Sequence, residues 1–257
     1  MQHEWTKNSE ENMKTGILVW DLSAAYDTLC PTLFCKKLKI YGFDSNACKW
    51  FMSFLMGRSQ RVKIGTAISD SVKLTSGVPQ GGILSPIIFI IYGADMEEWV
   101  KQSCIFNYAD DTESSCKDKD EQVVMRKLEE DATNILEFMA SNGLVANLTK
   151  TVFMMLNKKK ESEGTRIIIV GDLQIQESKS TKLLGMMIDN DQKWKSHFCG
   201  KGGLLSALNQ RLFMVKRMSN HISKKDITII IIPIQSILCF CYGLVIGPNG
   251  PIKRPKR

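Results

Sequence analysis

The chain has 257 residues, of which 44% are hydrophobic, and carries a formal net charge of +7. This length can form one large domain or two small ones, and the hydrophobic content argues against a disordered chain. The positive charge suits a polyanionic partner such as nucleic acid. Eight cysteines without a Cys-x-x-Cys pair, beside three histidines, argue against a zinc site and a disulfide scaffold. The polar start, residues 1–14, lacks the apolar core of a signal peptide, so we expect a cytoplasmic or nuclear protein, or one found in both.

The first half of the chain predicts one strand, two helices and a hairpin. An apolar strand spans residues 17–22 and leads into Asp21. Helical spacing of apolar side chains predicts helices over residues 31–41 and 44–56, each followed by a glycine. Residues 61–64 alternate like a strand, and residues 72–74 are expected to pair with them.

The second half continues the alternation of strands and helices after a segment rich in glycine and proline. Its predicted elements are an apolar helix over 85–96, a strand over 104–108, an amphipathic helix over 118–142, a strand over 151–156, a hairpin over 166–175 and a strand over 182–188. A lysine run at 158–160 marks a loop or a subdomain boundary, and the chain is helical from His197 onward. This order predicts an α+β fold, with an antiparallel sheet backed by helices.

Two acidic clusters lie at the ends of predicted buried strands. Asp21 follows the first strand, and Asp110 and Asp111 follow the strand over 104–108. Carboxylates are rarely left beside a core without a partner, and three that converge would repel each other unless cations lay between them. Hard divalent ions with oxygen ligands, about 3.5–4 Å apart, would satisfy such a group and serve phosphoryl transfer.

Three segments together resemble motifs A, B and C of a reverse transcriptase palm. They are Asp-Leu-Ser-Ala-Ala-Tyr-Asp-Thr at 21–28, Gly-Val-Pro-Gln-Gly-Gly-Ile-Leu-Ser-Pro at 77–86 and Tyr-Ala-Asp-Asp-Thr at 108–112. Each is weak evidence alone, but the three in this order are strong evidence. The wording is close to the enzymes of non-LTR (LINE- or jockey-type) retrotransposons. The resemblance implies an RNA-directed DNA polymerase that uses an RNA template, a DNA primer and dNTPs.

The same resemblance implies roles for individual residues. Asp21 and Asp110 would be the main ligands, and Asp111 a supporting ligand, of two Mg²⁺ ions, with Mn²⁺ as a possible replacement. Tyr26, five residues after Asp21, would exclude a ribose 2′-hydroxyl by its bulk. The other implied site residues are Gln80 and Gly81, which would pack against the incoming nucleotide, and Lys150 within the motif D-like segment 143–151, which would offset charge on the triphosphate.

The resemblance also divides the chain. Residues 1–16 would be a remnant of the fingers or a linker, 17–160 the palm, 161–195 the motif E and primer-grip region, and 196–257 a helical, thumb-like region with a basic tail. With so few residues before motif A, we expect the fingers to be largely missing and the chain to be an N-terminally truncated fragment. The segment Glu113-Ser114-Ser115 is more polar than expected for its strand, which fits a decayed element.

Three alternatives stay open on the sequence. The first is a catalytically inactive remnant that only binds nucleic acid, and the second is a maturase-type reverse transcriptase of a mobile intron. The third is a membrane-anchored protein, because residues 227–246 carry no charge over the length of a membrane span. Pro233 and Gln235 near the middle of that run argue against insertion.

Overall fold

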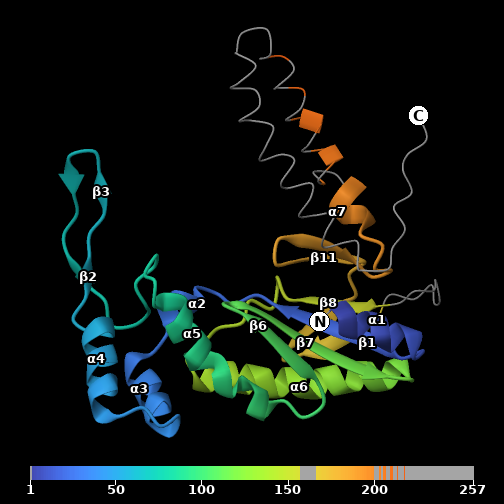
Figure 1. The fold of residues 1–257 in the computed structure, drawn as a ribbon, viewed down its shortest axis with the longest axis horizontal. Coiled ribbons are helices and arrows are strands. Elements are labelled where there is room, and N and C mark those ends of the chain that lie inside the picture. Colours follow the sequence, from blue (N-terminus) through green and yellow to red (C-terminus); the bar gives the residue numbers. More distant parts are fainter. Residues whose placement is uncertain are drawn as a thin grey trace. The chain divides into compact units, whose positions relative to one another are not determined.

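The fold is centred on a four-stranded antiparallel sheet (Figure 1). This computed structural model describes residues 2–156 and 166–199, together with residues 203, 205, 206, 209, 210, 213 and 217. The chain divides into two units, Met1–Lys193 and Trp194–Arg257, and each is described by itself. The sheet, the described helices before Trp194 and the predicted acidic site belong to the first.

The sheet has the strand order β6-β7-β1-β8, and every neighbouring pair is antiparallel. Its members are β1 (Lys14–Trp20), β6 (Cys104–Tyr108), β7 (Asp111–Asp118) and β8 (Val152–Leu156). Because β1 is central, its apolar residues are buried on both faces, Leu18 and Trp20 toward one layer and Ile17 toward the other. The predicted α+β fold with an antiparallel sheet is therefore confirmed.

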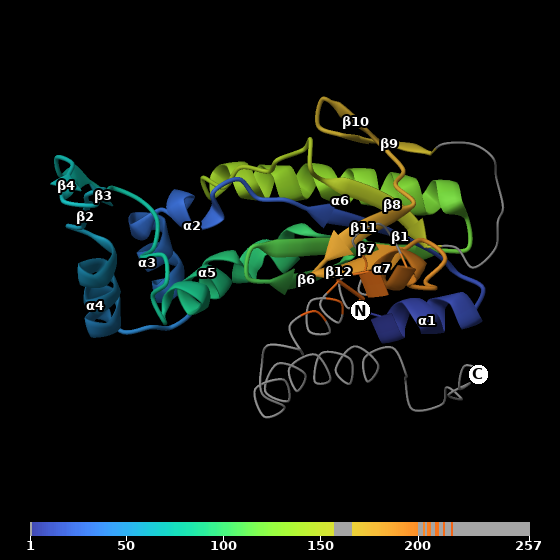
Figure 2. The ribbon, with the colours of Figure 1, turned by 90° about the horizontal axis from the view of Figure 1, so that it is seen from above.

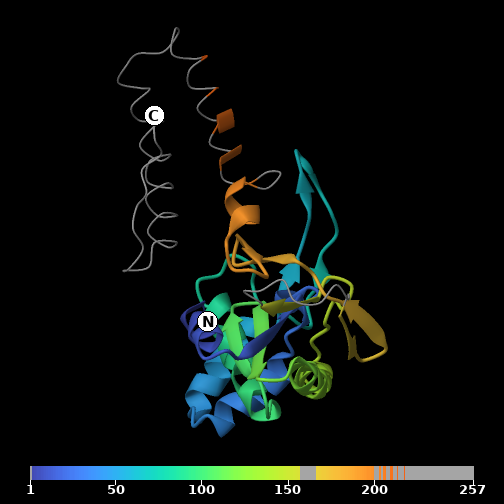
Figure 3. The same cartoon turned by 90° about the vertical axis from the view of Figure 1, so that its right-hand side faces the viewer.

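Helix α6 (Glu121–Ser141) covers one face of the sheet and packs against β1 and β7. In Figure 3 it is seen end-on below the strands. Its apolar stripe, including Val124 and Leu128, is completely buried. A side chain at Gly16 would place its Cβ 2.7 Å from Val124 Cγ1, so this glycine allows the helix to approach β1 closely.

Helix α1 (Gln2–Glu10) packs against β1 from the other side, and Figure 2 shows α1 and α6 on opposite sides of that strand. Trp5 is buried, and Asn8 Nδ2 donates to Thr15 Oγ1 at 3.3 Å. No helix was predicted here, because the segment is polar and has only a few apolar side chains. Its stability comes from this tertiary packing rather than from a strong amphipathic pattern.

The remaining helices lie between β1 and β6 in the sequence. They are α2 (Ala25–Thr28), α3 (Pro31–Ile40), α4 (Ser45–Leu55), α5 (Ser85–Gly93) and the 3₁₀ helix η1 (Ala94–Trp99). Asp44 caps α4 by accepting from the backbone N–H of Ala47 at 2.7 Å. The predicted helices over 31–41 and 44–56 are confirmed. The one predicted over 85–96 is α-helical only to Gly93, after which the chain tightens into η1.

A narrow β-ribbon follows α4 and projects away from it in Figure 1. It consists of β2 (Ser59–Gln60) paired with β5 (Val72–Lys73), and of β3 (Lys63–Ile64) paired with β4 (Ala67–Ile68). The expected pairing of residues 61–64 with 72–74 is wrong. Gly65, at φ +60°, makes a tight turn, so Lys63 and Ile64 pair with the residues directly after it.

Two hairpins follow the sheet. The predicted hairpin over 166–175 is confirmed as β9 (Ile167–Val170) with β10 (Leu173–Gln176), and β9 packs against α6. The single strand predicted over 182–188 is wrong, because β11 (Ser180–Leu183) and β12 (Met186–Asp189) form a second hairpin. Leu184 and Gly185 both have positive φ and turn the chain between them.

The second unit contributes helix α7 (Lys195–Cys199) to the described residues. The lysine run 158–160, most of the thumb-like region, the uncharged run 227–246 and the basic tail lie outside them. Among the described helices, none is both long and apolar enough to cross a membrane.

Asp131 on α6 fixes the loop that leads into β6. It is buried, and its carboxylate accepts from the backbone N–H groups of Lys101, Gln102 and Ser103 at 3.0, 3.0 and 2.6 Å. An Asp131→Ala variant would leave three donors unpaired, and we expect it to lower the free energy of unfolding by about 3 kcal/mol. Urea denaturation checks this, with Glu137→Ala on the exposed face of the same helix as control, expected to change stability by less than about 0.5 kcal/mol. Equal losses in the two variants would contradict the role given to Asp131.

Candidate active site

The predicted acids meet at one end of the sheet. Asp21 directly follows β1, whose pairing with β7 ends at Trp20 opposite Thr112, and Asp111 is the neighbouring residue of β7 at this same end. Asp110 lies in the turn between β6 and β7, where Ala109 has a φ of +56°. The fold thus brings Asp21 to the same sheet end as Asp110 and Asp111, which lie about 90 residues later in the sequence.

The electrostatics of this sheet end reflect that proximity. The pKa of Asp111 is raised above its ordinary value, first by burial and then by the negative charges of Asp110 and Asp21. The pKa of the Tyr26 phenol is also raised, first by burial and then by the charge of Asp110. The charge of Asp110 therefore acts on both Asp111 and Tyr26, which places these three side chains near one another.

Lys150 lies beside Asp21, two residues before the start of β8. Its Nζ is 3.6 Å from Asp21 Oδ2, with the two side chains 68% and 42% exposed, so solvent weakens the ion pair. The main chain fixes this approach more firmly. The N–H of Asn147 donates to the Asp21 carbonyl at 2.7 Å, and Ser23 N–H donates to the Val145 carbonyl at 2.8 Å. The motif D-like segment therefore packs directly against the end of motif A.

The donor set suits hard cations, because carboxylate oxygens are the ligands that Mg²⁺ and Mn²⁺ prefer. Within the described residues, however, no group of three or more His, Cys, Asp or Glu side chains is close enough together to hold one ion. The three carboxylates are neighbours along the strand ends, and Asp21 turns toward the ammonium of Lys150.

Tyr26 and the motif B-like loop form the side of the site next to α2. The half-buried Tyr26 ring packs 5.1 Å from the ring centroid of Phe89. Gln80 is exposed, and its side-chain amide donates to Asp27 Oδ1 and Oδ2 at 3.0 and 3.1 Å. Gly81 has a φ of +80° and open space where a Cβ would lie. Asp27 was not among the predicted site residues, although it directly follows Tyr26.

A cavity of about 310 Å³ lies next to Asp111, which forms part of its lining. It is formed by β6, the first residue of β7 and the end of β11 with the turn that follows it, through Ile105, Phe106, Asn107, Tyr108, Asp111, Leu183 and Leu184. Tyr108 is 70% exposed, so its ring is available for stacking. The segment that resembles motif E therefore lies beside Asp111. Tyr108 was not predicted as a site residue, although an aromatic residue two positions before paired acids is a usable signal.

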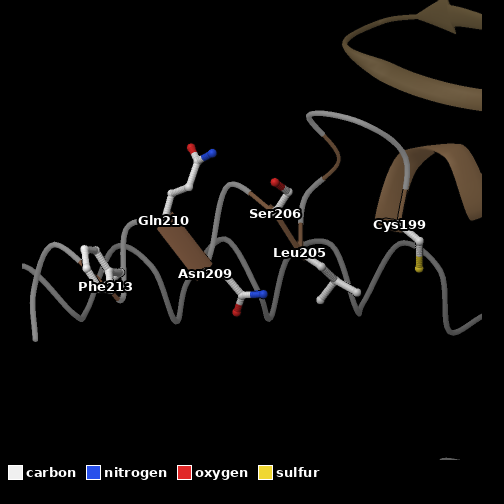
Figure 4. Close-up of a pocket in the computed structure, with 6 residues that line it drawn as sticks. All are labelled: Cys199, Leu205, Ser206, Asn209, Gln210 and Phe213. Atoms are coloured by element: carbon white, nitrogen blue, oxygen red, sulfur yellow. The ribbon is translucent and has the colours of Figure 1, made fainter.

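A second hollow, of about 600 Å³, lies within the second unit. Figure 4 shows its six lining residues along one segment, Cys199, Leu205, Ser206, Asn209, Gln210 and Phe213. These side chains include no carboxylate, histidine, lysine or arginine. Among these described lining residues none is charged, and Cys199 is the one common metal ligand. The acidic sheet end, with its three carboxylates, is therefore the better candidate for chemistry.

Comparison with protein families decides the assignment. The family model described as "Reverse transcriptase (RNA-dependent DNA polymerase)" matches residues 2–188, which include every predicted site residue. The chain belongs to the reverse transcriptase family. The family is described as one of RNA-dependent DNA polymerases, a class of nucleotidyltransferase.

Individual relatives agree with this family. A Drosophila melanogaster protein described as "Probable RNA-directed DNA polymerase from transposon X-element" is 22% identical over 149 residues, which cover 56% of this chain and 16% of that protein. The predicted resemblance to retrotransposon reverse transcriptases is thus confirmed. This chain spans only about a sixth of that relative's length.

Solved structures show the same fold. An apo telomerase from Candida tropicalis, truncated of its C-terminal domain, matches with a TM-score of 0.53 and 14% identity, over 74% of this chain and 38% of that one. Telomerase from the same species, in complex with the TWJ fragment of telomeric RNA, matches with a TM-score of 0.52 and 16% identity, over 95% and 42%. The sheet of this reverse transcriptase is therefore a polymerase palm.

Proposed function

We propose that this chain carries the catalytic palm of an RNA-directed DNA polymerase, which joins a dNTP to the 3′-hydroxyl of a DNA primer on an RNA template. The observation that carries the proposal is the strand register that pairs Trp20 with Thr112 and so brings Asp21 and Asp111 to the same end of the sheet, with Asp110 in the adjoining turn and Lys150 beside Asp21. The net charge of +7 supports binding to the phosphates of a primer–template duplex.

Asp21, Asp110 and Asp111 would hold two Mg²⁺ ions, with Mn²⁺ as a substitute. Such ions supply Lewis-acid stabilisation of the charge that develops on the attacking and leaving oxygens. The three carboxylates would contribute negative charge at one end of the sheet, where it can stabilise bound cations. The raised pKa of Asp111 supports this assignment, because mutual repulsion of the acids favours a bound cation.

The remaining site residues would bind and orient the nucleotide. Lys150 would exchange its exposed ion pair with Asp21 for the triphosphate, since an ammonium offsets phosphate charge. Tyr26, held against Phe89, would exclude a ribose 2′-hydroxyl by steric contact. Gln80 and Gly81 would pack against the nucleotide, because Gly81 leaves space for close approach of a ligand to the backbone.

Metal removal tests the proposal. We expect the chain to extend a DNA primer on an RNA template with Mg²⁺ and dNTPs, to stop when EDTA is added and to resume when excess Mg²⁺ is restored. Ribonucleotides offered in place of dNTPs should extend the primer far more slowly. Extension that continued in EDTA would contradict metal-dependent catalysis. A folded chain that bound primer–template but never extended it would favour the alternative of an inactive nucleic-acid-binding remnant.

A further inference from the structure

The side chain of Asp27 holds the side chain of Gln80 in one orientation. Gln80 Nε2 is 3.0 and 3.1 Å from the two carboxylate oxygens of Asp27. A carboxylate has no proton to donate, so only the NH₂ end of the Gln80 amide can face it. The carbonyl oxygen Oε1 must then point away from Asp27, and no described residue donates a hydrogen bond to it.

The backbone around this pair is held by several independent contacts. Val78 N–H donates to the Tyr26 carbonyl at 2.8 Å, and Ser76 Oγ donates to the Asp27 carbonyl at 2.9 Å. Gly77 has a φ of +79°, and a Cβ there would lie 2.8 Å from Asp27 Cα. The motif B-like loop therefore rests directly on α2, and the distance between Asp27 and Gln80 does not depend on their own hydrogen bond.

Arg58 holds the same loop from its other side. Its guanidinium donates to the carbonyls of Ser76 at 3.1 Å and Gly77 at 2.6 Å, and its Nε donates to the Leu55 carbonyl at 2.8 Å. The loop is thus fixed between α2 and the end of α4. These backbone contacts do not fix the rotation of the exposed Gln80 side chain. The hydrogen bonds to Asp27 restrain that rotation.

We propose that Asp27 is a positioning residue, which turns the Gln80 amide so that Oε1 is presented to the incoming nucleotide as a hydrogen-bond acceptor. This inference rests on the proposed function, in which Gln80 contacts the nucleotide. An acceptor at this place would select a nucleotide donor, either a sugar hydroxyl or a base amino group. Tyr26, on the same short helix, would read the sugar by shape, while Asp27 would act only through Gln80.

Nucleotide binding in Mg²⁺ tests the proposal without requiring catalysis. We expect Asp27→Asn to raise the Kd for dCTP about five- to tenfold. An asparagine side chain can either accept or donate a hydrogen bond, so it would allow the Gln80 amide to rotate by 180° and present its NH₂ group instead of Oε1. In a Gln80→Ala background the same change should have no effect, since a residue that acts through Gln80 loses its influence with it. Asp70→Asn, which removes one exposed carboxylate on the β-ribbon, is the matched control for charge and should leave the Kd unchanged.

Two further measurements separate the possible donors and the possible failures. If 2′,3′-dideoxy-CTP shows no loss with Asp27→Asn, the donor is the 3′-hydroxyl; if dTTP, which has no base amino group, shows none, the donor is the base. The Gln80 side-chain amide signal in a ¹⁵N–¹H spectrum should shift in Asp27→Asn whether or not the chain is a polymerase. An unshifted signal, or an equal loss of affinity in the Gln80→Ala background, would overturn the positioning role. A shifted signal in a chain that binds no nucleotide would instead refute the proposed function, and the role of Asp27 in it.

Discussion

Replacing Asp21 by asparagine is expected to reduce Mg²⁺-dependent primer extension at least about a thousandfold, while the chain stays folded. The variant keeps the shape of the side chain but removes one of the three charges that would hold the ions, and electrostatic stabilisation commonly contributes more than any other effect to such reactions. Its backbone contacts, such as the bond from Asn147 N–H to the Asp21 carbonyl, do not depend on the side chain. Single-turnover extension measures the rate, and circular dichroism checks the fold.

The same strand system offers a matched control. Asp118 lies at the far end of β7, where it pairs with Lys127 at 2.8 Å, much as Asp21 pairs with Lys150. Its partner in the register is Lys14, at the opposite end of β1 from Asp21. Asp118→Asn should therefore extend primers at the wild-type rate. Equal losses in the two variants would mean that extension depends on net charge or on ion pairs in general, and would remove Asp21 from the proposed site.

The place of the candidate site in the fold could be predicted from the sequence because its acidic residues come at strand ends, where a short motif and a hydrophobic run coincide. Asp21, Asp110 and Asp111 each follow such a run, and the predicted bounds of β1 and β6 are close to those observed. The helix over 118–142 is clear for the same reason, since a long amphipathic stripe predicts its own buried face. The helix in fact begins at Glu121, because β7 extends through Asp118 and Asp120 caps the helix.

The contacts between segments that are far apart in the sequence could not be predicted from such local patterns. Nothing near Asp27 in the sequence indicates that its carboxylate meets Gln80, 53 positions later, because that contact depends on how α2 and the following loop pack. Nor does the polar segment 2–10 have a pattern that predicts a helix; its helix forms against β1. The turn at Leu184 was missed for another reason, since this residue adopts a positive φ that its type disfavours.

Glu113 gives the second large expected effect, on stability rather than on catalysis. It lies within β7 between Val19 and Phe106 on the neighbouring strands, and only 1% of it is exposed. Neither of its carboxylate oxygens has a hydrogen-bond partner in the described part of the chain. Burial, with a smaller contribution from the charge of Glu4, raises its pKa from 4.5 to about 8. The polar residue noticed in this strand is thus a buried acid that is neutral below that pH.

The sign of the pH effect follows from this raised pKa. Between pH 4.5 and about 8 the folded chain holds a proton on Glu113 that the unfolded chain has lost, so the free energy of unfolding falls as the pH rises. The fall is about 1.4 kcal/mol per pH unit, or roughly 5 kcal/mol over the whole interval. Above pH 8 both states are ionised at this residue, and its contribution becomes constant.

A Glu113→Gln variant should therefore be more stable than the wild type at pH 8 by several kcal/mol and nearly equal to it at pH 5, because glutamine matches the protonated acid in shape and charge. Urea denaturation at pH 5, 6, 7 and 8 measures the difference, and Glu113→Leu should show the same loss of pH dependence without a buried polar group. Glu137→Gln, on the exposed face of α6, should retain the wild-type pH profile. If Glu113→Gln kept the pH profile of the wild type, as Glu137→Gln should, then Glu113 would not be the buried acid that sets this profile. The polar strand next to the candidate aspartates would then carry no stability cost at neutral pH.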